Sequence, residues 1–240
     1  MFYEKTRKIG EMMDDSETNS TKKPNEQGGL SRRTLCIGIG GAAVMLGLGG
    51  LKFIGTQPII RPPGGQDEDR LLSACMYCQI CYEICPKNVI VPAKIEDGIL
   101  VLRTPTLSFD TNYCNWCEDE NNGVPLCAQA CPTTALSLPA KATAENTILG
   151  IAELNKDFCL AYRLIGCRFC FDACPYEAME LDDYGRPYVL ADKCNGCGAC
   201  ESVCVSLQNA SITSGARERA IIIRALDENG QMIPGSGNRV

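Results

Sequence analysis

The sequence predicts an α+β fold of two similar units, each built from short β-hairpins and small helices, preceded by an N-terminal signal or anchor helix. One four-cysteine pattern occurs four times, and short apolar segments separated by turn residues lie between the repeats. Aromatic residues make up only 6% of the 240 residues. The apolar core of each unit should therefore be small, and another group must help to organise it.

The first cysteine pattern lies in the stretch Ser73–Pro86, which reads S-A-C-M-Y-C-Q-I-C-Y-E-I-C-P. Its cysteines are Cys75, Cys78, Cys81 and Cys85. This C-x2-C-x2-C-x3-C-P run is typical of bacterial ferredoxins, in which the first three thiolates bind one [4Fe-4S] cluster and the fourth binds another. Thiolate is the ligand that iron-sulfur clusters prefer, and backbone N–H groups in such a tight loop face the sulfur atoms. The fourth cysteine is therefore expected to reach a second cluster.

Three further patterns vary the first one. The middle gap grows to nine residues in the second pattern, the first gap grows to seven in the third, and Val205 replaces the proline in the fourth. Their cysteines are Cys114, Cys117, Cys127 and Cys131; Cys159, Cys167, Cys170 and Cys174; and Cys194, Cys197, Cys200 and Cys204. The four patterns use 16 of the 17 cysteines, so the sequence predicts sixteen iron ligands and four [4Fe-4S] clusters.

Two other uses of these cysteines compete with iron-sulfur clusters. Zinc also binds four-cysteine sites built from C-x2-C pairs, but it has no use for a third cysteine three residues further on. An exported chain with an even set of cysteines can instead form a disulfide framework. Four repeats of one ligand pattern favour clusters over both alternatives.

The composition excludes several function classes. The chain has no histidine, which excludes Rieske ligation, C-x-x-C-H haem attachment and histidine-based acid-base catalysis. No G-x-G-x-x-G opens a helix, so a nicotinamide or flavin site is unsupported. Residues 62–240 carry 14 basic and 23 acidic side chains, which disfavours nucleic acid and suits either a positively charged redox partner or a merely soluble surface. We therefore expect an electron-transfer subunit without catalytic residues; a catalytic oxidoreductase or a cluster-based sensor remains the other class.

The N-terminal part differs in composition from the rest. Residues 1–30 are polar and should be disordered, and residues 31–55 combine the pair Arg32 and Arg33 with an apolar, glycine-rich run. This combination is typical of a twin-arginine export signal, and the alternative is a membrane anchor. No alanine lies between Val44 and Ser73, so an A-x-A cleavage site is missing and the segment is expected to stay attached to the membrane. Cys36 is interpreted as a small apolar residue of this segment.

The remaining boundaries follow from turn residues and apolar segments. Residues 56–69 are interpreted as a linker, 70–224 as the four-cluster region and 225–240 as a tail. Hairpins are predicted from residues 88–91 with 98–103, from 135–138 with 148–154, and from 178–181 with 187–190. Trp116 is expected to shield a cluster from water and to help set its potential. Lys193, beside Cys194, is expected to be a solvated lysine.

Several segments in one order resemble the NapG/MauM-type ferredoxin subunits: the twin arginines, R-P-P-G-G, C-N-W-C-E-D with C-A-Q-A-C-P, and C-N-G-C-G-A-C-E-S-V-C-V. The resemblance runs from about Ser31 to Ile212. It implies an exported protein of the periplasmic side, in which sixteen cysteines bind four [4Fe-4S] clusters. Such a protein would take electrons from a membrane quinol-oxidising iron-sulfur partner and pass them to an extracytoplasmic reductase of the nitrate reductase type. The second pattern also resembles that of the iron-sulfur subunit of dimethyl sulfoxide reductase.

Which patterns share clusters is open between two arrangements. The 19 residues between Cys174 and Cys194 are near the ferredoxin norm, which favours pairing pattern one with two and pattern three with four. The resemblance of pattern two to the dimethyl sulfoxide reductase subunit implies a nested arrangement, in which the middle two patterns form one unit inside a unit made from the outer two. The nested arrangement, which places Cys204 with pattern one and Cys85 with pattern four, is the one favoured here.

Overall fold

The structure is a computed structural model that describes residues 58–163, 166–206, 218–227 and 230–233. These residues belong to one compact unit, residues 48–240. The predicted disordered stretch and the export or anchor segment, with Arg32, Arg33 and Cys36, lie outside the described residues and stay predictions. In the described part, no helix is long and apolar enough to cross a membrane.

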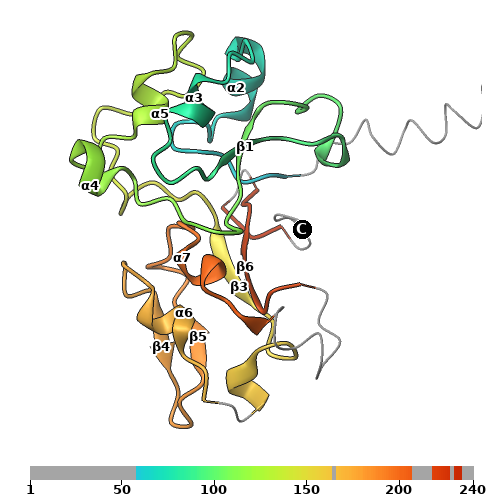
Figure 1. Cartoon of the computed structure of the whole chain (residues 1–240), viewed down its shortest axis with the longest axis vertical. Helices are drawn as coiled ribbons and strands as arrows, with labels where there is room; N and C mark the ends of the chain where they lie inside the picture. Colours follow the sequence, from blue (N-terminus) through green and yellow to red (C-terminus); the bar gives the residue numbers. More distant parts are fainter. Residues whose placement is uncertain (1–57, 164–165, 207–217, 228–229, 234–240) are drawn as a thin grey trace, which may run out of the picture. The chain divides into compact units, whose positions relative to one another are not determined.

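The described residues form an α+β fold of very short elements, as the sequence predicts (Figure 1). The first half, residues 58–147, contains α2 (Glu68–Ala74), α3 (Ile80–Glu83), β1 (Ile90–Pro92), η1 (Ile95–Asp97), β2 (Pro105–Leu107), α4 (Glu118–Asn121) and α5 (Leu126–Gln129). The second half, residues 148–233, contains β3 (Ile151–Leu154), η2 (Leu160–Arg163), α6 (Phe169–Asp172), β4 (Met179–Leu181), β5 (Pro187–Val189), α7 (Ala199–Ser202) and β6 (Ile221–Arg224).

Helix α2 leads the chain into the first cysteine pattern. The Asp67 carboxylate caps its first turn by accepting the backbone N–H of Arg70 at 3.0 Å, and such a cap is worth about 1 kcal/mol. At its other end the Cys75 N–H donates to the Leu71 carbonyl at 3.0 Å, and the backbone then becomes extended. The helix therefore ends where the cysteine loop begins.

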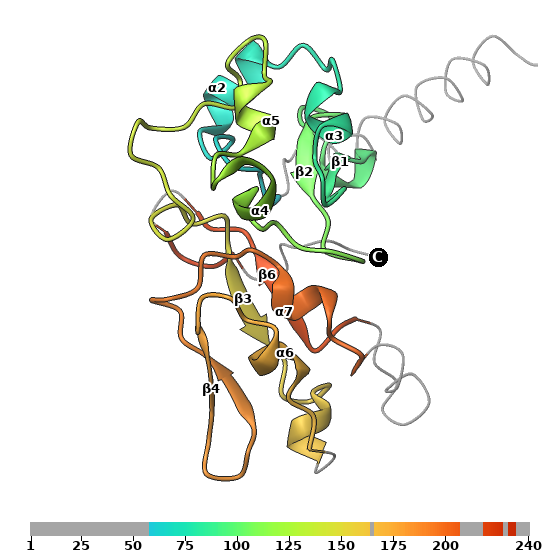
Figure 2. The ribbon, with the colours of Figure 1, turned by 60° about the vertical axis from the view of Figure 1, so that its left-hand side comes forward.

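Antiparallel strand pairs accompany the cysteine patterns in each half. β1 pairs with β2, and β4 pairs with β5, with Met179 opposite Val189. The hairpin predicted from residues 178–181 and 187–190 is thereby confirmed. The third pair, β3 with β6, joins segments far apart in the sequence, and Figures 1 and 2 both show these two strands side by side.

The other two predicted hairpins have the wrong strand partners. Residues 98–103 are not a strand, because this stretch turns back on itself and buries Val101, and the partner of β1 begins later, at Pro105. The predicted strand 148–154 does not pair with residues 135–138. Only residues 151–154 of it form a strand, β3, which pairs instead with β6. The three isoleucines of β6 are each less than 9% exposed. Because β3 and β6 are far apart in the sequence, no local residue pattern predicts that they pair.

The predicted linker, residues 56–69, is also corrected by the structure. Ile60 and Arg61 are only 2% and 4% exposed. The Ile60 carbonyl accepts the N–H of Leu107 at 2.9 Å, and the Gly64 carbonyl accepts the N–H of Ser137 at 3.0 Å. This segment therefore corresponds to β3 of the second half. Each of the two segments precedes cysteines of its own half and hydrogen-bonds to the chain that follows those cysteines.

Arg61 holds this segment in place. Its guanidinium donates to the Thr104 hydroxyl and to the Pro105 carbonyl, both at 2.8 Å, and it forms an ion pair with Glu68. Because a buried guanidinium left without partners is strongly unfavourable, this network fixes residues 60–65 against β2. The proline, glycine and charged residues of this segment thus led to the prediction of a linker, but the segment is ordered and buried.

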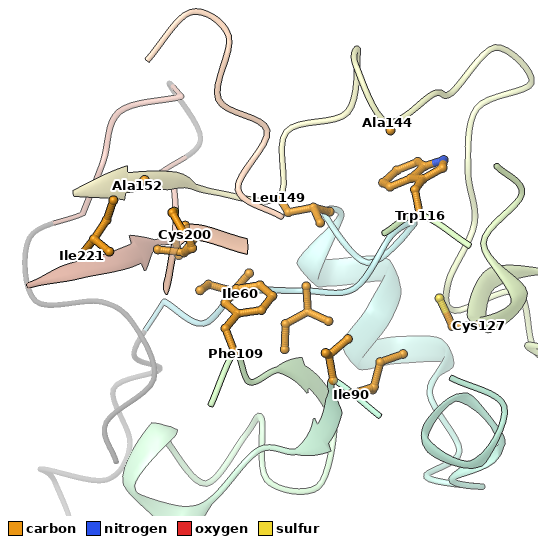
Figure 3. Close-up of a cluster of buried hydrophobic side chains, with 14 of the residues drawn as sticks. Ile60, Ile90, Phe109, Trp116, Cys127, Ala144, Leu149, Ala152, Cys200 and Ile221 are labelled. Carbon is orange, nitrogen blue, oxygen red and sulfur yellow. The ribbon is translucent and has the colours of Figure 1, made fainter. Parts of the chain in front are cut away.

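The largest apolar cluster of the described residues has members from both halves (Figure 3). Ile60, Phe109 and Trp116 belong to it from the first half, and Leu149 and Ile221 from the second. Several cysteines of the four patterns are part of the same cluster, among them Cys127 and Cys200. Residues of this cluster therefore also line the cavities that the cysteines surround.

Candidate iron-sulfur sites

Four cavities in the described residues are each lined by four cysteines, and we name them sites A to D. Site A has Cys75, Cys78, Cys81 and Cys131, site B has Cys85, Cys114, Cys117 and Cys127, site C has Cys174, Cys194, Cys197 and Cys200, and site D has Cys159, Cys167, Cys170 and Cys204. Their volumes, 390, 350, 310 and 330 Å³, include space open to solvent. No group of three or more described His, Cys, Asp or Glu residues is placed to hold a single metal ion. The four sets of thiols surround cavities of similar volume.

The nested arrangement of the patterns is wrong. Cys85 lines site B together with Cys114 and Cys117 of the second pattern, and Cys204 lines site D with cysteines of the third. The patterns therefore pair consecutively, one with two and three with four. The physical reason is that hairpin β1–β2 folds the second pattern back onto the first and hairpin β4–β5 folds the fourth onto the third. Among the described residues no hairpin joins patterns two and three.

Short helices set the spacing within each pair of sites. Helix α3 leads from Cys81 in site A to Cys85 in site B, and α5 returns from Cys127 in site B to Cys131 in site A. Helices α6 and α7 connect sites C and D in the same way. Four residues advance a helix by about 6 Å. The C-x3-C spacing therefore holds the two sites of a pair next to each other.

The two compact patterns, one and four, share one backbone conformation. In the first, Tyr77 and Gln79 have φ angles of 56° and 68°. At the equivalent places in the fourth, Gly196 and Gly198 have φ angles of 75° and 86°. A left-handed conformation costs a residue other than glycine about 1–2 kcal/mol, so the first pattern bears a strain that the fourth avoids.

Glycine is required in the fourth pattern because Phe109 of the first half and the backbone of Gly150 lie against it. A Cβ atom on Gly198 would be 2.1 Å from the Phe109 ring, and one on Gly196 would be 2.4 Å from the Gly150 backbone. The corresponding Tyr77 is 43% exposed, so its side chain meets no such obstacle. The glycines thus allow close approach of the fourth pattern to Phe109 and to the backbone of Gly150.

Burial raises the pKa of thiols at all four sites, and neighbouring cysteines raise it further. The pKa of Cys81, Cys114, Cys170 and Cys197 rises to about 12 in each case. For Cys131 burial also acts in this direction, but hydrogen bonds, led by the Leu136 N–H at 3.5 Å, lower its pKa. Most of these thiols would therefore remain protonated at neutral pH unless positive charge is bound beside them.

Backbone N–H groups also donate to cysteine sulfur atoms in the second half. The Ala178 N–H lies 3.3 Å from the Cys174 sulfur, and the Ala152 N–H lies 3.4 Å from the Cys194 sulfur. Hydrogen bonds of this kind stabilise thiolates and tune the potential of a bound cluster. The first of them comes from the residue that leads into β4, and the second comes from β3. The strands thus contribute directly to the sites.

Two asparagines, which the sequence analysis did not single out, shape the second and fourth patterns. Asn115 and Asn195 each follow the first cysteine, and each side-chain oxygen accepts the backbone N–H of the second cysteine at 3.1 Å. Asn195, 4% exposed, also donates to the Ala144 carbonyl at 2.8 Å. The repeated C-N-x-C in the two patterns was the signal that could have identified them.

Sites B and C meet where the two halves join. The Cys114 N–H of the first half donates to the Cys197 carbonyl of the second half at 2.9 Å. Within the second half, the Leu149 N–H donates to the Asn195 carbonyl at 2.8 Å. Burial is the main cause of the raised pKa of Cys114, and Cys197 also contributes to it. A ligand-bearing loop of one half is therefore hydrogen-bonded to a ligand-bearing loop of the other.

The two other residues singled out from the sequence are placed as expected. Trp116 is 2% exposed and lines site B. Lys193 is exposed. Among the sixteen cysteines, Cys78 is the one that is classed as exposed, so site A has the most open thiol.

The consecutive arrangement predicts which substitutions act on the same site. Cys85→Ser and Cys117→Ser should each alter the same electron paramagnetic resonance (EPR) signal in the reduced protein, with loss of up to about four of sixteen iron atoms. Cys197→Ser should alter a different signal. If Cys85→Ser and Cys197→Ser changed one common signal, the assignment of Cys85 to site B would be wrong.

Comparisons with known proteins find an iron-sulfur domain and ferredoxin-type relatives. Residues 165–206 match the model of the 4Fe-4S dicluster domain. The methylamine utilization ferredoxin-type protein MauM of Methylophilus methylotrophus is 32% identical over 206 residues, which cover 80% of this chain and 88% of the relative. The MauM protein of Methylorubrum extorquens is 36% identical over 72% of this chain and 80% of the relative, and the ferredoxin-type protein NapG of Escherichia coli is 32% identical over 72% and 78%.

Proposed function

We propose that this chain, which belongs to the NapG/MauM family of ferredoxin-type proteins, relays electrons through four [4Fe-4S] clusters held at sites A to D. It is an iron-sulfur electron-transfer protein and not a catalytic enzyme. The proposed number of clusters rests on the four cavities, each of which is lined by four cysteines.

The residues at the four sites fit the proposed group. Sixteen thiols surround four cavities of similar volume, and backbone N–H groups reach sulfur atoms at sites A and C. A bound [4Fe-4S] cluster supplies reversible one-electron chemistry. The raised thiol pKa values mean that ligation must release protons from buried thiols, so iron binding and folding are coupled.

The sites follow one another in the order A, B, C, D. Helices α3 and α5 connect A with B, and the hydrogen bond from Cys114 to Cys197 connects B with C. Helices α6 and α7 connect C with D. Each site thus neighbours the next, which is what a relay of one-electron carriers requires, and A and D are its two ends.

Both ends offer access to a partner. At site A the thiol of Cys78 is exposed beside Met76 and Tyr77, which are 61% and 43% exposed. At site D the lining residue Phe169 is 55% exposed. We assign the two ends to two redox partners: a membrane quinol-oxidising iron-sulfur protein and an extracytoplasmic reductase of the nitrate reductase type. The resemblance of the second pattern to the dimethyl sulfoxide reductase subunit makes another molybdopterin oxidoreductase the second candidate system.

The proposed location is the extracytoplasmic face of the cytoplasmic membrane. It rests on the twin arginines Arg32 and Arg33, since the twin-arginine route is known for folded cargo and would let clusters be inserted before export. Cell fractionation of a variant with both arginines replaced by lysine tests this location. The proposal requires that the iron-loaded variant stay in the cytoplasm.

Redox titration of the purified chain tests the relay. We expect about sixteen iron and sixteen sulfide per chain, four reversible one-electron steps after dithionite reduction, and reoxidation by the cognate reductase. Nitrate, nitrite or a sulfoxide alone should not be turned over, because the chain has no histidine and no dinucleotide fingerprint. Steady turnover of one of these compounds by the isolated chain would contradict the proposal.

A further inference from the structure

We propose that the hydroxyl group of Ser206 donates a hydrogen bond to the Cys204 sulfur at site D and raises the reduction potential of the cluster there. This inference rests on the proposed function, because it requires a [4Fe-4S] cluster at site D. It adds a specific role for one side chain that is not an iron ligand.

The first observation is the short contact between the hydroxyl group and an iron ligand. The Ser206 oxygen lies 3.1 Å from the Cys204 sulfur, and in the free thiol form either group could donate. A cysteine that ligates iron is a thiolate and has no proton to give, so only the serine hydroxyl can then donate. With a cluster bound, the contact is therefore an O–H···S hydrogen bond to that ligand.

The second observation is that the backbone holds this hydroxyl group in place. The Ala220 N–H donates to the Ser206 oxygen at 2.7 Å, and the Ala220 carbonyl accepts the Asn155 N–H at 2.7 Å. Ala220 directly precedes β6, whose position is fixed by its pairing with β3. The serine oxygen is thus already an acceptor, and among the described residues the Cys204 sulfur is the one acceptor for its hydrogen.

Burial strengthens this hydrogen bond. The Ser206 side chain is 2% exposed, so bulk water does not compete for its hydroxyl group. Apart from the cysteines, Ser206 is the one polar side chain among the described residues that line site D, and its neighbours there are apolar, for example Leu160 and Ile221. A hydrogen bond to a charged sulfur is stronger in such surroundings than in water.

The equivalent residue differs at the other three sites. It follows the fourth cysteine of its pattern by two positions and is Thr133 at site A, Lys87 at site B and Tyr176 at site C. The Thr133 hydroxyl lies 3.8 Å from the sulfur of its cysteine, a longer and weaker contact, and the Lys87 ammonium lies 3.1 Å from the Glu120 carboxylate. Within the described part of the chain, the short contact between a hydroxyl group and a ligand sulfur is therefore specific to site D.

The expected consequence is a shift of potential at one site. Donation to sulfur stabilises the reduced, more negative cluster more than the oxidised one, which raises the potential. Ser206→Ala should therefore make reduction of the site D cluster about tenfold less favourable, which is a fall of about 59 mV in one midpoint potential for a one-electron step. The other three midpoint potentials should stay unchanged.

Redox titration followed by EPR compares the iron-loaded full chain with its Ser206→Ala variant. Cys167→Ser should alter the signal whose midpoint falls, and so identify the cluster as that of site D. Ser202→Ala is the matched control, because the Ser202 hydroxyl donates to the Ala199 carbonyl at 2.9 Å and not to sulfur. This control should leave all four midpoints in place. Full iron content together with four unchanged midpoints in Ser206→Ala would overturn the inference.

A second measurement separates hydrogen-bond donation from packing. Electron-nuclear double resonance of the partly reduced, unsubstituted protein should show a proton coupling in the site D signal that disappears after brief transfer to D2O, before buried amide protons exchange. Ser206→Ala should lack this coupling. If Ser206→Ala loses iron, the unsubstituted protein decides, and absence of the coupling there overturns the inference. Iron and sulfide content of the unsubstituted protein, measured on the same samples, reveals failure of the four-cluster proposal separately.

Discussion

Removal of iron and sulfide is expected to unfold residues 58–233. Helices α3, α5, α6 and α7 have four residues each, which is far too short for independent stability in water. The strand pairs are two-stranded with three or four residues per strand, and isolated pairs of this kind are marginal at best. Buried cysteines such as Cys127 and Cys200 belong to the apolar core and surround the cavities.

The experiment compares chelator alone with chelator plus ferricyanide, which oxidises the clusters. Far-ultraviolet circular dichroism, protease sensitivity and iron content are followed in parallel on the same samples. Loss of iron and loss of ordered structure should coincide, because ligation supplies folding free energy. An iron-free protein that kept its protease resistance would show that the polypeptide core is sufficient by itself, contrary to this expectation.

Gly196→Ala is expected to destabilise the protein strongly and to separate the fourth pattern from the backbone around Gly150. The added Cβ would lie 2.4 Å from the backbone nitrogen and oxygen of Gly150, which cannot move aside as a side chain can. Separating the two segments would break the hydrogen bond from Leu149 to Asn195. We expect a loss of about 3 kcal/mol or more. This corresponds to a thermal transition roughly 6–12 °C lower.

Gly185→Ala is the matched control for this substitution. Gly185 has a φ of 73°, close to the 75° of Gly196, but nothing lies within 4 Å of its added Cβ. It should therefore show only the conformational cost of about 1 kcal/mol. Both variants are heated at one scan rate, since cluster loss makes unfolding irreversible. Equal shifts of the two transitions would mean that the Gly150 contact is not what makes glycine necessary at position 196.

Local features of the chain were open to prediction from sequence. Three cysteines at i, i+3 and i+6 are brought together by a single tight loop, so the thiols of pattern one can be grouped without knowledge of the fold. Hairpin β4–β5 was likewise predictable, because its strands are separated only by D-D-Y-G-R. The family was predictable from the residues of the cysteine patterns and from their order in the chain, and the comparisons confirm it.

Long-range contacts were decided only by the tertiary structure. The fourth cysteine of each pattern serves a site formed by another pattern, so the partner of Cys85 depends on where hairpin β1–β2 returns the chain. The pairing of β3 with β6 and the burial of residues 60–65 also depend on segments distant in sequence, and turn-rich composition concealed the latter.

The need for glycine at position 196 has the same origin. It comes from Gly150, which precedes β3, and nothing within the fourth pattern reveals it. By itself, the sequence determined which residues could serve as iron ligands, because ligand chemistry and loop spacing are local properties. The tertiary structure decided which of them share a site and in what order the sites follow, because those depend on backbone contacts between segments that the sequence does not place next to each other.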